Sequence, residues 1–197
     1  MYDVIIIGAR VAGSSTALLL ARKGYRVLIV DRATFPSDTL STHQIQIPGS
    51  LALARWGLLD NVRATNPGST SHVHFEYGDI VLEGEYPTVN GIKQIHSPRR
   101  YLLDKLLIDA AVEAGAELRE GFVTEDLLRD GDRIVGIRGR LTSGGVATER
   151  ARMVIGADGK HSFVAKSVDA PKYDEQPILT CGYYSYWDGL DLTHGAI

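Results

Sequence analysis

The chain has 197 residues, of which 44% are hydrophobic and 23% charged, a composition typical of one globular domain or slightly more. The formal net charge of −3 excludes the strongly basic surface of a nucleic-acid-binding protein. A single cysteine, Cys181, excludes an internal disulfide framework. No segment is apolar over a membrane-spanning length, and an apolar run begins too early for a signal peptide, so we expect a cytoplasmic protein.

The first 31 residues organise the sequence. An apolar run over residues 4–7 ends at Gly8, a helical pattern follows Gly13, and a second apolar run ends at Asp31. Short runs rich in Ile and Val are typical of strands that are buried on both faces. The order strand, glycine turn, helix, strand and acid predicts a dinucleotide-binding βαβ unit.

Each part of this unit has a physical task. Gly8 allows the sharp turn from strand to helix, and Gly13 lets the helix lie close to the sheet. The free N–H groups at residues 11–14 would face a pyrophosphate and favour its negative charge. At the end of the second strand, the Asp31 carboxylate would accept hydrogen bonds from an adenosine ribose.

The motif departs from its usual form at Arg10, where G-x-G-x-x-G has its middle glycine. That glycine normally lets the backbone approach the pyrophosphate. We expect Arg10 to bring a positive charge to the phosphates instead, at some cost to the close approach. The alternative is an α/β unit with a tight turn and no nucleotide.

A polar loop over residues 38–44 follows the second strand and leaves it at the ligand-bearing edge, so we expect its polar groups to reach the cofactor. Pro48 and Gly49 predict a break, after which Ser50 would cap a helix over residues 51–56. Further along, residues 66–71 form a polar break.

Apolar and polar residues alternate over residues 72–86 on both sides of Gly78-Asp79, which predicts a hairpin with one solvated face.

The second half reads as a helix and then a series of strands. Residues 98–115 carry apolar side chains at helical spacing, and Gly115 ends the helix. We expect a strand over residues 116–120, an antiparallel meander, a short helix over 162–167 and an opening strand of another sheet near the end. The meander strands are residues 122–128, 133–141 and 147–154.

Four motifs in this order resemble the FAD-dependent oxidoreductases of the p-hydroxybenzoate hydroxylase type, which include aromatic monooxygenases, flavin halogenases and geranylgeranyl reductases. The matching residues are Gly8-Ala9-Arg10-Val11-Ala12-Gly13, Asp31-Arg32, Arg99-Arg100…Leu103-Asp104 and Gly156-Ala157-Asp158-Gly159…Ser162. The resemblance implies an α/β fold: a Rossmann-like FAD-binding βαβ domain, an antiparallel β-meander and part of a mixed substrate-binding sheet. The family's third motif, Gly-Asp, is expected beyond the last residue of this chain.

The resemblance also implies residue roles. Asp31 would hold the ribose, Arg32 would lie over the adenosine, and Val123 would meet the adenine through its backbone. The arginines at the start of the 98–115 helix would contact the pyrophosphate or flavin chain, and the loop after the second strand would run beside the ribityl chain. The expected cofactor-binding residues are Gly8, Arg10, Val11, Ala12, Gly13, Asp31, Arg32, Ser41, Thr42, Arg99, Arg100, Val123, Asp158 and Gly159.

The implied function is FAD-dependent oxidation or reduction of a small organic substrate, with NAD(P)H as the electron donor and a monooxygenase-like reaction. A saturating reductase, an NAD-dependent dehydrogenase and a non-catalytic FAD-binding fragment of a larger flavoenzyme stay open. Residues 1–71 and 97–170 would form the FAD-binding domain, and residues 72–96 and 171–197 an incomplete substrate sheet. An unfinished sheet edge predicts self-association.

Several side chains have two readings. His43 either touches the flavin or makes local hydrogen bonds, and Asp158 either contacts the cofactor or caps the following helix. His72 and His74 would share one strand face, with too few ligands for a metal. We assign no catalytic residue. The aromatic residues near the end either line a substrate cavity or reflect strand propensity: Tyr183, Tyr184, Tyr186 and Trp187.

Overall fold

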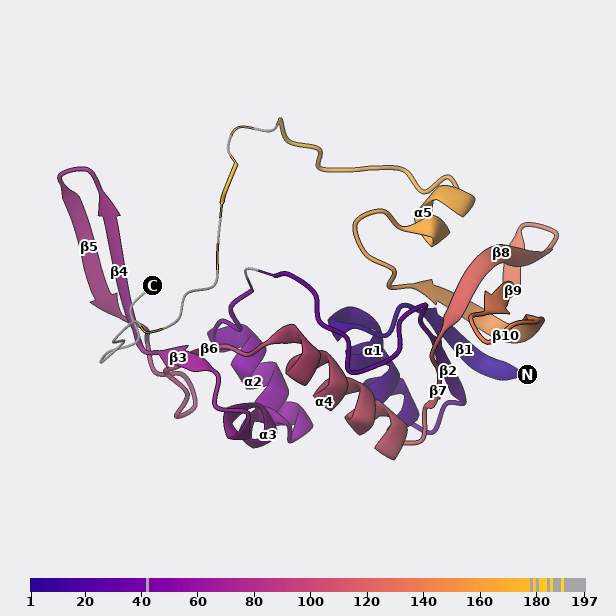
Figure 1. The fold of residues 1–197 in the computed structure, drawn as a ribbon, viewed down its shortest axis with the longest axis horizontal. Coiled ribbons are helices and arrows are strands. Elements are labelled where there is room, and N and C mark those ends of the chain that lie inside the picture. Colours follow the sequence, from indigo (N-terminus) through magenta and orange to yellow (C-terminus); the bar gives the residue numbers. More distant parts are fainter. Residues whose placement is uncertain (42, 178, 180, 184, 186–188, 190–197) are drawn as a thin grey trace. The chain divides into compact units, whose positions relative to one another are not determined.

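The computed structural model describes residues 1–41, 43–177, 179, 181–183, 185 and 189 (Figure 1). The chain divides into two compact units. The first unit contains Met1–Asp38 and Tyr101–Glu175, and the second contains Thr39–Arg100. Among the described residues, no helix combines the length and the apolar character needed to cross a bilayer.

The first unit is built on a six-stranded sheet with the order β7-β2-β1-β10-β9-β8. Strands β7, β2 and β1 run parallel, and β8 and β9 form an antiparallel pair. The long strand β10 joins the two halves, because residues 146–150 pair antiparallel with β9 and residues 151–156 pair parallel with β1. The strands are β1 (Tyr2–Ile7), β2 (Val27–Val30), β7 (Glu117–Arg119), β8 (Phe122–Asp130), β9 (Arg133–Leu141) and β10 (Val146–Gly156).

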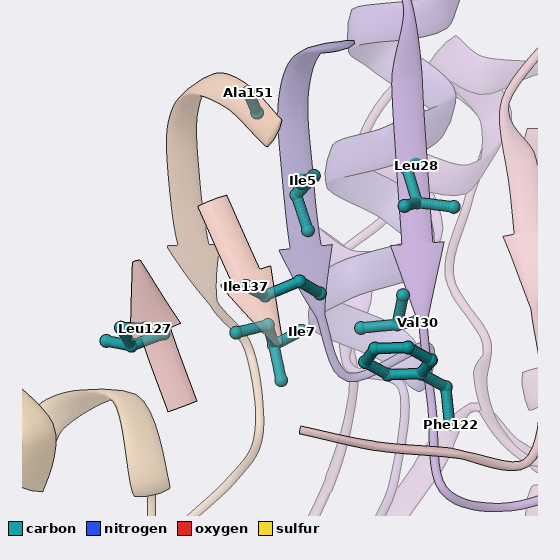
Figure 2. Packing of buried hydrophobic residues seen from close by; sticks show 8 residues of the cluster. All are labelled: Ile5, Ile7, Leu28, Val30, Phe122, Leu127, Ile137 and Ala151. Carbon is teal, nitrogen blue, oxygen red and sulfur yellow. The ribbon is translucent and has the colours of Figure 1, made fainter. Parts of the chain in front are cut away.

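Apolar side chains fill both faces of the parallel strands, as their continuous apolar runs predict. On one face, residues of five strands form a single cluster, which Figure 2 shows: Ile5, Ile7, Leu28, Val30, Phe122, Leu127, Ile137 and Ala151. The Phe122 ring takes the space that a side chain at Gly139 on β9 would fill. On the other face, the Ile6 side chain lies against Gly13 of α1 (Val11–Ala21). The sheet is therefore a well-packed base for the loops at its carboxyl edge.

The second unit contains two short helices, a small two-stranded sheet and a hairpin. The helix α2 (Ile47–Trp56) packs against α3 (Leu59–Ala64) and β6 (Ile95–Ser97). Strand β3 (Gly68–Thr70) pairs antiparallel with β6, and β4 (His72–Tyr77) pairs antiparallel with β5 (Ile80–Glu85).

Most predicted elements are present. The hairpin turns at Gly78-Asp79, and the helix expected over residues 98–115 is α4 (Arg100–Glu113). Strand β7, the β8–β10 meander and α5 (Phe163–Ser167) also lie where the sequence predicts them. The expected strand near the end falls partly outside the described residues, since Tyr184, Tyr186 and Trp187 are not described.

Two local predictions are wrong, and two features are missed. The helix after the loop begins at Ile47, because Pro48 fits the first helical turn, where its missing N–H is not needed. Ser50 lies buried inside this helix and does not cap it. The sequence reading also misses α3 and the pair β3–β6, whose strands have only three residues each.

The two units do not follow the predicted domain boundaries. Residues 39–71 group with the hairpin, whereas the sequence places them with the nucleotide-binding part. The physical reason is that α2 packs on α3 and β6 within the second unit. The functional division into a cofactor domain and a substrate sheet stays a prediction.

Candidate functional site

The turn between β1 and α1 is closed by backbone contacts that only glycine permits. Gly8 has a φ of +102°, and a Cβ there would overlap the carbonyl oxygen of Ala157. A Cβ at Gly13 would overlap the carbonyl oxygen of Gly8. Ala157 in turn donates its N–H to the Ile7 carbonyl at 2.8 Å. The first and last predicted motifs therefore meet at one point, backbone against backbone.

The amino end of α1 offers hydrogen-bond donors at this turn. The N–H groups of Val11, Ala12 and Gly13 have no acceptor within the helix, because the first turn of any α-helix lacks one. Val11 and Ala12 are exposed, and the first turn carries no acidic residue. The positive end of the helix dipole adds to the attraction for an anion.

Asp31 lies beside the same turn. Its Oδ2 accepts a hydrogen bond from the Ala9 N–H at 2.7 Å, and its Oδ1 accepts one from the Ala33 N–H at 2.8 Å. The carboxylate therefore fixes the turn to the end of β2. A carboxylate has about four acceptor positions, so these two bonds leave capacity for the predicted ribose contact.

The start of β8 completes this edge. Phe122 donates its N–H to the Asp31 carbonyl at 2.8 Å, and Gly121 donates to the Ala33 carbonyl at 3.2 Å. Val123 directly follows Phe122, so these bonds place it beside the segment that contains Asp31. Its exposed fraction is 41%. Arg32 is exposed and makes no hydrogen bond or ion pair with any described residue. The structure thus brings together the three residues predicted to surround an adenosine.

Arg10 has protein partners that the sequence reading did not foresee. Its Nη1 lies 2.6 Å from Oδ2 of Asp104 and 3.3 Å from the Ser37 carbonyl oxygen. Its Nη2 donates to Oγ of Ser37 at 3.2 Å, and its Cζ lies 5.5 Å from the centre of the Phe35 ring. The predicted contact of Arg10 with phosphates stays a prediction.

Asp104, the buried partner of Arg10, is a residue to which the sequence analysis gives no role. It belongs to the family motif, but no role was assigned to it. A signal was present, because position 104 shares a helical face with the buried Leu107, Ile108 and Ala111. A carboxylate on an apolar helix face requires a cationic or hydrogen-bonding partner in the fold.

Asp158 caps α5. Its Oδ1 accepts from Ser162 Oγ at 2.6 Å, and its Oδ2 accepts from the N–H groups of Phe163 at 2.6 Å and Val164 at 3.1 Å. Gly159 follows with a φ of +84°. The capping interpretation is confirmed, and a cofactor contact by Asp158 or Gly159 stays a prediction.

The remaining predicted residues belong to the second unit. Ser41 Oγ lies 3.0 Å from Nδ1 of His43, the local hydrogen bond that the second reading of His43 expects. Arg99 precedes α4, and Arg100 is its first residue. Thr42 lies outside the described residues. The cofactor contacts expected of these residues stay predictions.

The two histidines on β4 share one face and pair with glutamates. His72 Nε2 lies 3.2 Å from Glu85, and the ring nitrogens of His74 lie 2.7 Å from Glu83 and 2.9 Å from Glu76. Within the part of the chain that the structure describes, no group of three or more potential ligands is arranged for a metal ion. On this face, each of the two histidines contacts a glutamate of β5.

Comparison with known proteins identifies this arrangement. A family model described as an FAD-binding domain matches residues 1–187. The chain belongs to the FAD-binding domain family. The predicted resemblance to FAD-dependent oxidoreductases and the α/β fold class are thereby confirmed.

Three relatives of this FAD-binding domain show its range. The 6-methylpretetramide 4-monooxygenase of Streptomyces rimosus is 29% identical over 91% of this chain and 44% of its own. The probable electron transfer flavoprotein-quinone oxidoreductase YdiS of Escherichia coli strain K12 is 28% identical over 85% of this chain and 38% of its own. The structure of the myxobacterial chondrochloren halogenase CndH, an FAD-dependent halogenase, superposes with a TM-score of 0.74 at 25% identity, over 81% of this chain and 38% of its own. The chain spans less than half the length of these relatives.

The residues of the turn fit FAD. Gly8 and Gly13 carry no side chain at the two points where the turn closes, and the exposed amides at the start of α1 are suited to a pyrophosphate. Asp31, Arg32 and Val123 lie together at the carboxyl edge of the sheet, where the adenosine next to that pyrophosphate would lie. The described residues of the first unit thus provide donors and an acceptor for the nucleotide half of the cofactor.

Proposed function

We propose that the chain forms the adenosine- and pyrophosphate-binding part of an FAD-dependent oxidoreductase. The observation that carries this proposal is the glycine turn between β1 and α1, closed against Ala157 and fixed by Asp31. Bound FAD would supply the redox chemistry, which side chains alone do not provide. The chain's own residues bind and orient the nucleotide.

Each group has a definite task in this proposal. The amides of Val11 and Ala12 donate hydrogen bonds to the pyrophosphate, and the α1 dipole favours its charge. Asp31 accepts hydrogen bonds from the ribose, Arg32 lies over the adenosine, and Val123 meets the adenine through its backbone. Asp158 keeps α5 and the preceding turn ordered beside Gly8.

For the whole enzyme we propose a monooxygenase-like reaction on a small organic substrate, with NAD(P)H as the electron donor. The support is the family and the monooxygenase among its relatives. A quinone oxidoreductase among the relatives keeps oxygen-independent electron transfer as the second candidate. The arginines Arg99 and Arg100 are proposed pyrophosphate or flavin-chain contacts, together with Ser41 and Thr42 beside the ribityl chain.

Two further proposals concern the second unit. Residues 72–96 and 171–197 would contribute to the sheet that covers the substrate. The hairpin exposes Tyr77 and Leu82, and among the described residues β4 and β5 pair only with each other. We propose self-association through these open edges, which light scattering at rising concentration tests.

The test of the proposed function is a visible absorbance spectrum before and after adding FAD and desalting. A flavin spectrum that stays with the protein supports the proposal. Binding of NAD without FAD would replace it with an NAD-dependent dehydrogenase, and binding of neither would leave a non-catalytic fragment.

Asp31→Ala sharpens this test. Loss of a hydrogen bond to a charged group is expected to weaken FAD binding by about 1.5–3 kcal/mol. Asp132→Ala, an exposed acid in the turn between β8 and β9, is the matched control. Isothermal titration with FAD measures both, and unchanged affinity of Asp31→Ala would remove Asp31 from the site.

A further inference from the structure

We propose that Arg10 and Asp104 form a positioning pair, in which Arg10 holds the phosphate-binding turn through Asp104 and does not itself bind the phosphates. This inference rests on the proposed FAD site. It concerns the one position at which the chain departs from the glycine motif.

The side chain of Arg10 reaches partners outside the turn and outside α1. Nη1 contacts Asp104 on α4, and both Nη atoms contact Ser37 in the loop after β2. The guanidinium also lies over the Phe35 ring in the same loop. One residue thereby joins the turn, the α4 helix and the loop that leaves β2.

Burial makes the pairing of these two charges important for the stability of the fold. The Asp104 side chain is 0% exposed and that of Arg10 is 31% exposed. A buried carboxylate is stable only when its charge is compensated at close range. Because α4 is packed into the fold through Leu103 and Leu107, Asp104 is a fixed anchor for the guanidinium.

The backbone of Arg10 transmits this anchoring to the amides of α1. Arg10 is the residue before the helix, and its carbonyl accepts hydrogen bonds from the Ser14 N–H at 2.9 Å and Ser14 Oγ at 2.7 Å. Its φ of −82° and ψ of −164° are ordinary for any residue, so the position does not require glycine. Holding Arg10 therefore holds the first turn of α1.

The competing interpretation is that Arg10 supplies its charge directly to the pyrophosphate. The two interpretations predict opposite effects of removing the Asp104 charge. If Arg10 binds phosphate, Asp104→Asn frees the guanidinium and leaves FAD binding unchanged or stronger. If the pair positions the turn, Asp104→Asn weakens FAD binding although Arg10 keeps its charge.

The experiment compares Asp104→Asn, Arg10→Gln and the double variant with the parent chain. The matched control is Asp109→Asn, which removes the same charge from an exposed ion pair with Lys105 on the same helix. We expect each single variant to weaken FAD binding about tenfold, and the double variant to be no weaker than either, because coupled residues are non-additive. Quenching of flavin fluorescence measures the dissociation constant, and thermal melting without FAD shows that each variant is folded.

Hydrogen exchange without FAD separates this inference from the FAD proposal. We expect Asp104→Asn to speed exchange of the amides at residues 9–14 and to leave those of β9 unchanged. If the parent chain binds no FAD, the proposed function fails. The exchange measurement still tests whether the Arg10–Asp104 pair holds the turn. Unchanged exchange at residues 9–14, or FAD binding that Asp104→Asn leaves unchanged or strengthens, overturns the inference.

Discussion

Two ion-paired regions of the molecule have almost the same distances and very different surroundings. The Arg10–Asp104 contact is 2.6 Å long, and its carboxylate side is 0% exposed. The His74 contacts with Glu83 and Glu76 are 2.7 and 2.9 Å long, and the glutamates are 71% and 69% exposed. Because water screens the second set, distance alone does not rank their energies.

The comparison teaches where charge determines structure. In the first unit, a buried pair joins three segments that come from distant parts of the sequence. On the hairpin, the His74–Glu83 pair links two strands whose backbone hydrogen bonds already fix the register, and the His74–Glu76 pair lies within one strand. We therefore expect the effects of substitution to follow burial.

The largest expected effect is that of Arg10→Met. Removing the cation takes away the guanidinium that lies 2.6 Å from the buried Asp104 carboxylate, so we expect the free energy of unfolding to fall by about 3 kcal/mol. Denaturant unfolding followed by circular dichroism measures this change. Lys105→Met is the control, because its partner Asp109 is exposed, and a loss as large as that of Arg10→Met would contradict the ranking by burial.

An intermediate effect is expected for Asp158→Ala. The variant loses three hydrogen bonds that hold the start of α5, so we expect the free energy of unfolding to fall by about 1–2 kcal/mol. Thermal melting of the variant beside Asp132→Ala checks this. An equal effect of Asp132→Ala, an exposed acid in the turn between β8 and β9, would show that the cap is not the cause.

A smaller, pH-dependent effect is expected at His96, a residue that is 1% exposed. Burial, followed by the positive charge of Arg63, lowers the pKa of His96 below its ordinary value of 6.5. The unfolded chain then binds a proton more readily, so stability falls as the pH falls below 6.5. His96→Gln removes this dependence, and unfolding curves between roughly pH 5.5 and 7.5, one unit on either side of the ordinary histidine pKa, measure it. If the free energy of unfolding of His96→Gln fell with decreasing pH as steeply as that of the parent chain, the prediction would be contradicted.

The smallest effect is expected at His74. Hydrogen bonds to Glu76 and then Glu83 raise the pKa of His74 above 6.5, so its contribution to stability is present below that pH and is lost as the pH rises through the raised value. The sign is opposite to that of His96. Because the group is exposed, we expect His74→Gln to leave the melting temperature unchanged at pH 6, and a clear drop would show that the exposed pairs matter.

Much of the fold was predictable from local patterns. The strand–turn–helix unit up to Asp31, the hairpin at Gly78 and the α4 helix all follow from apolar periodicity and from glycine positions. Such signals are local, because the period of the apolar residues reports which face is buried. The resemblance of four motifs to a known family also predicted FAD as the cofactor.

What the sequence by itself determined is the βαβ unit, its glycine turn and the family. Tertiary structure alone decided that β10 joins the parallel and antiparallel halves, that β3 and β6 pair, and that Arg10 is bound to Asp104. These features bring together residues far apart in the chain, such as Arg10 and Asp104, which are separated by 94 positions. No local period encodes them, since the partner of a buried charge is set only when the segments pack.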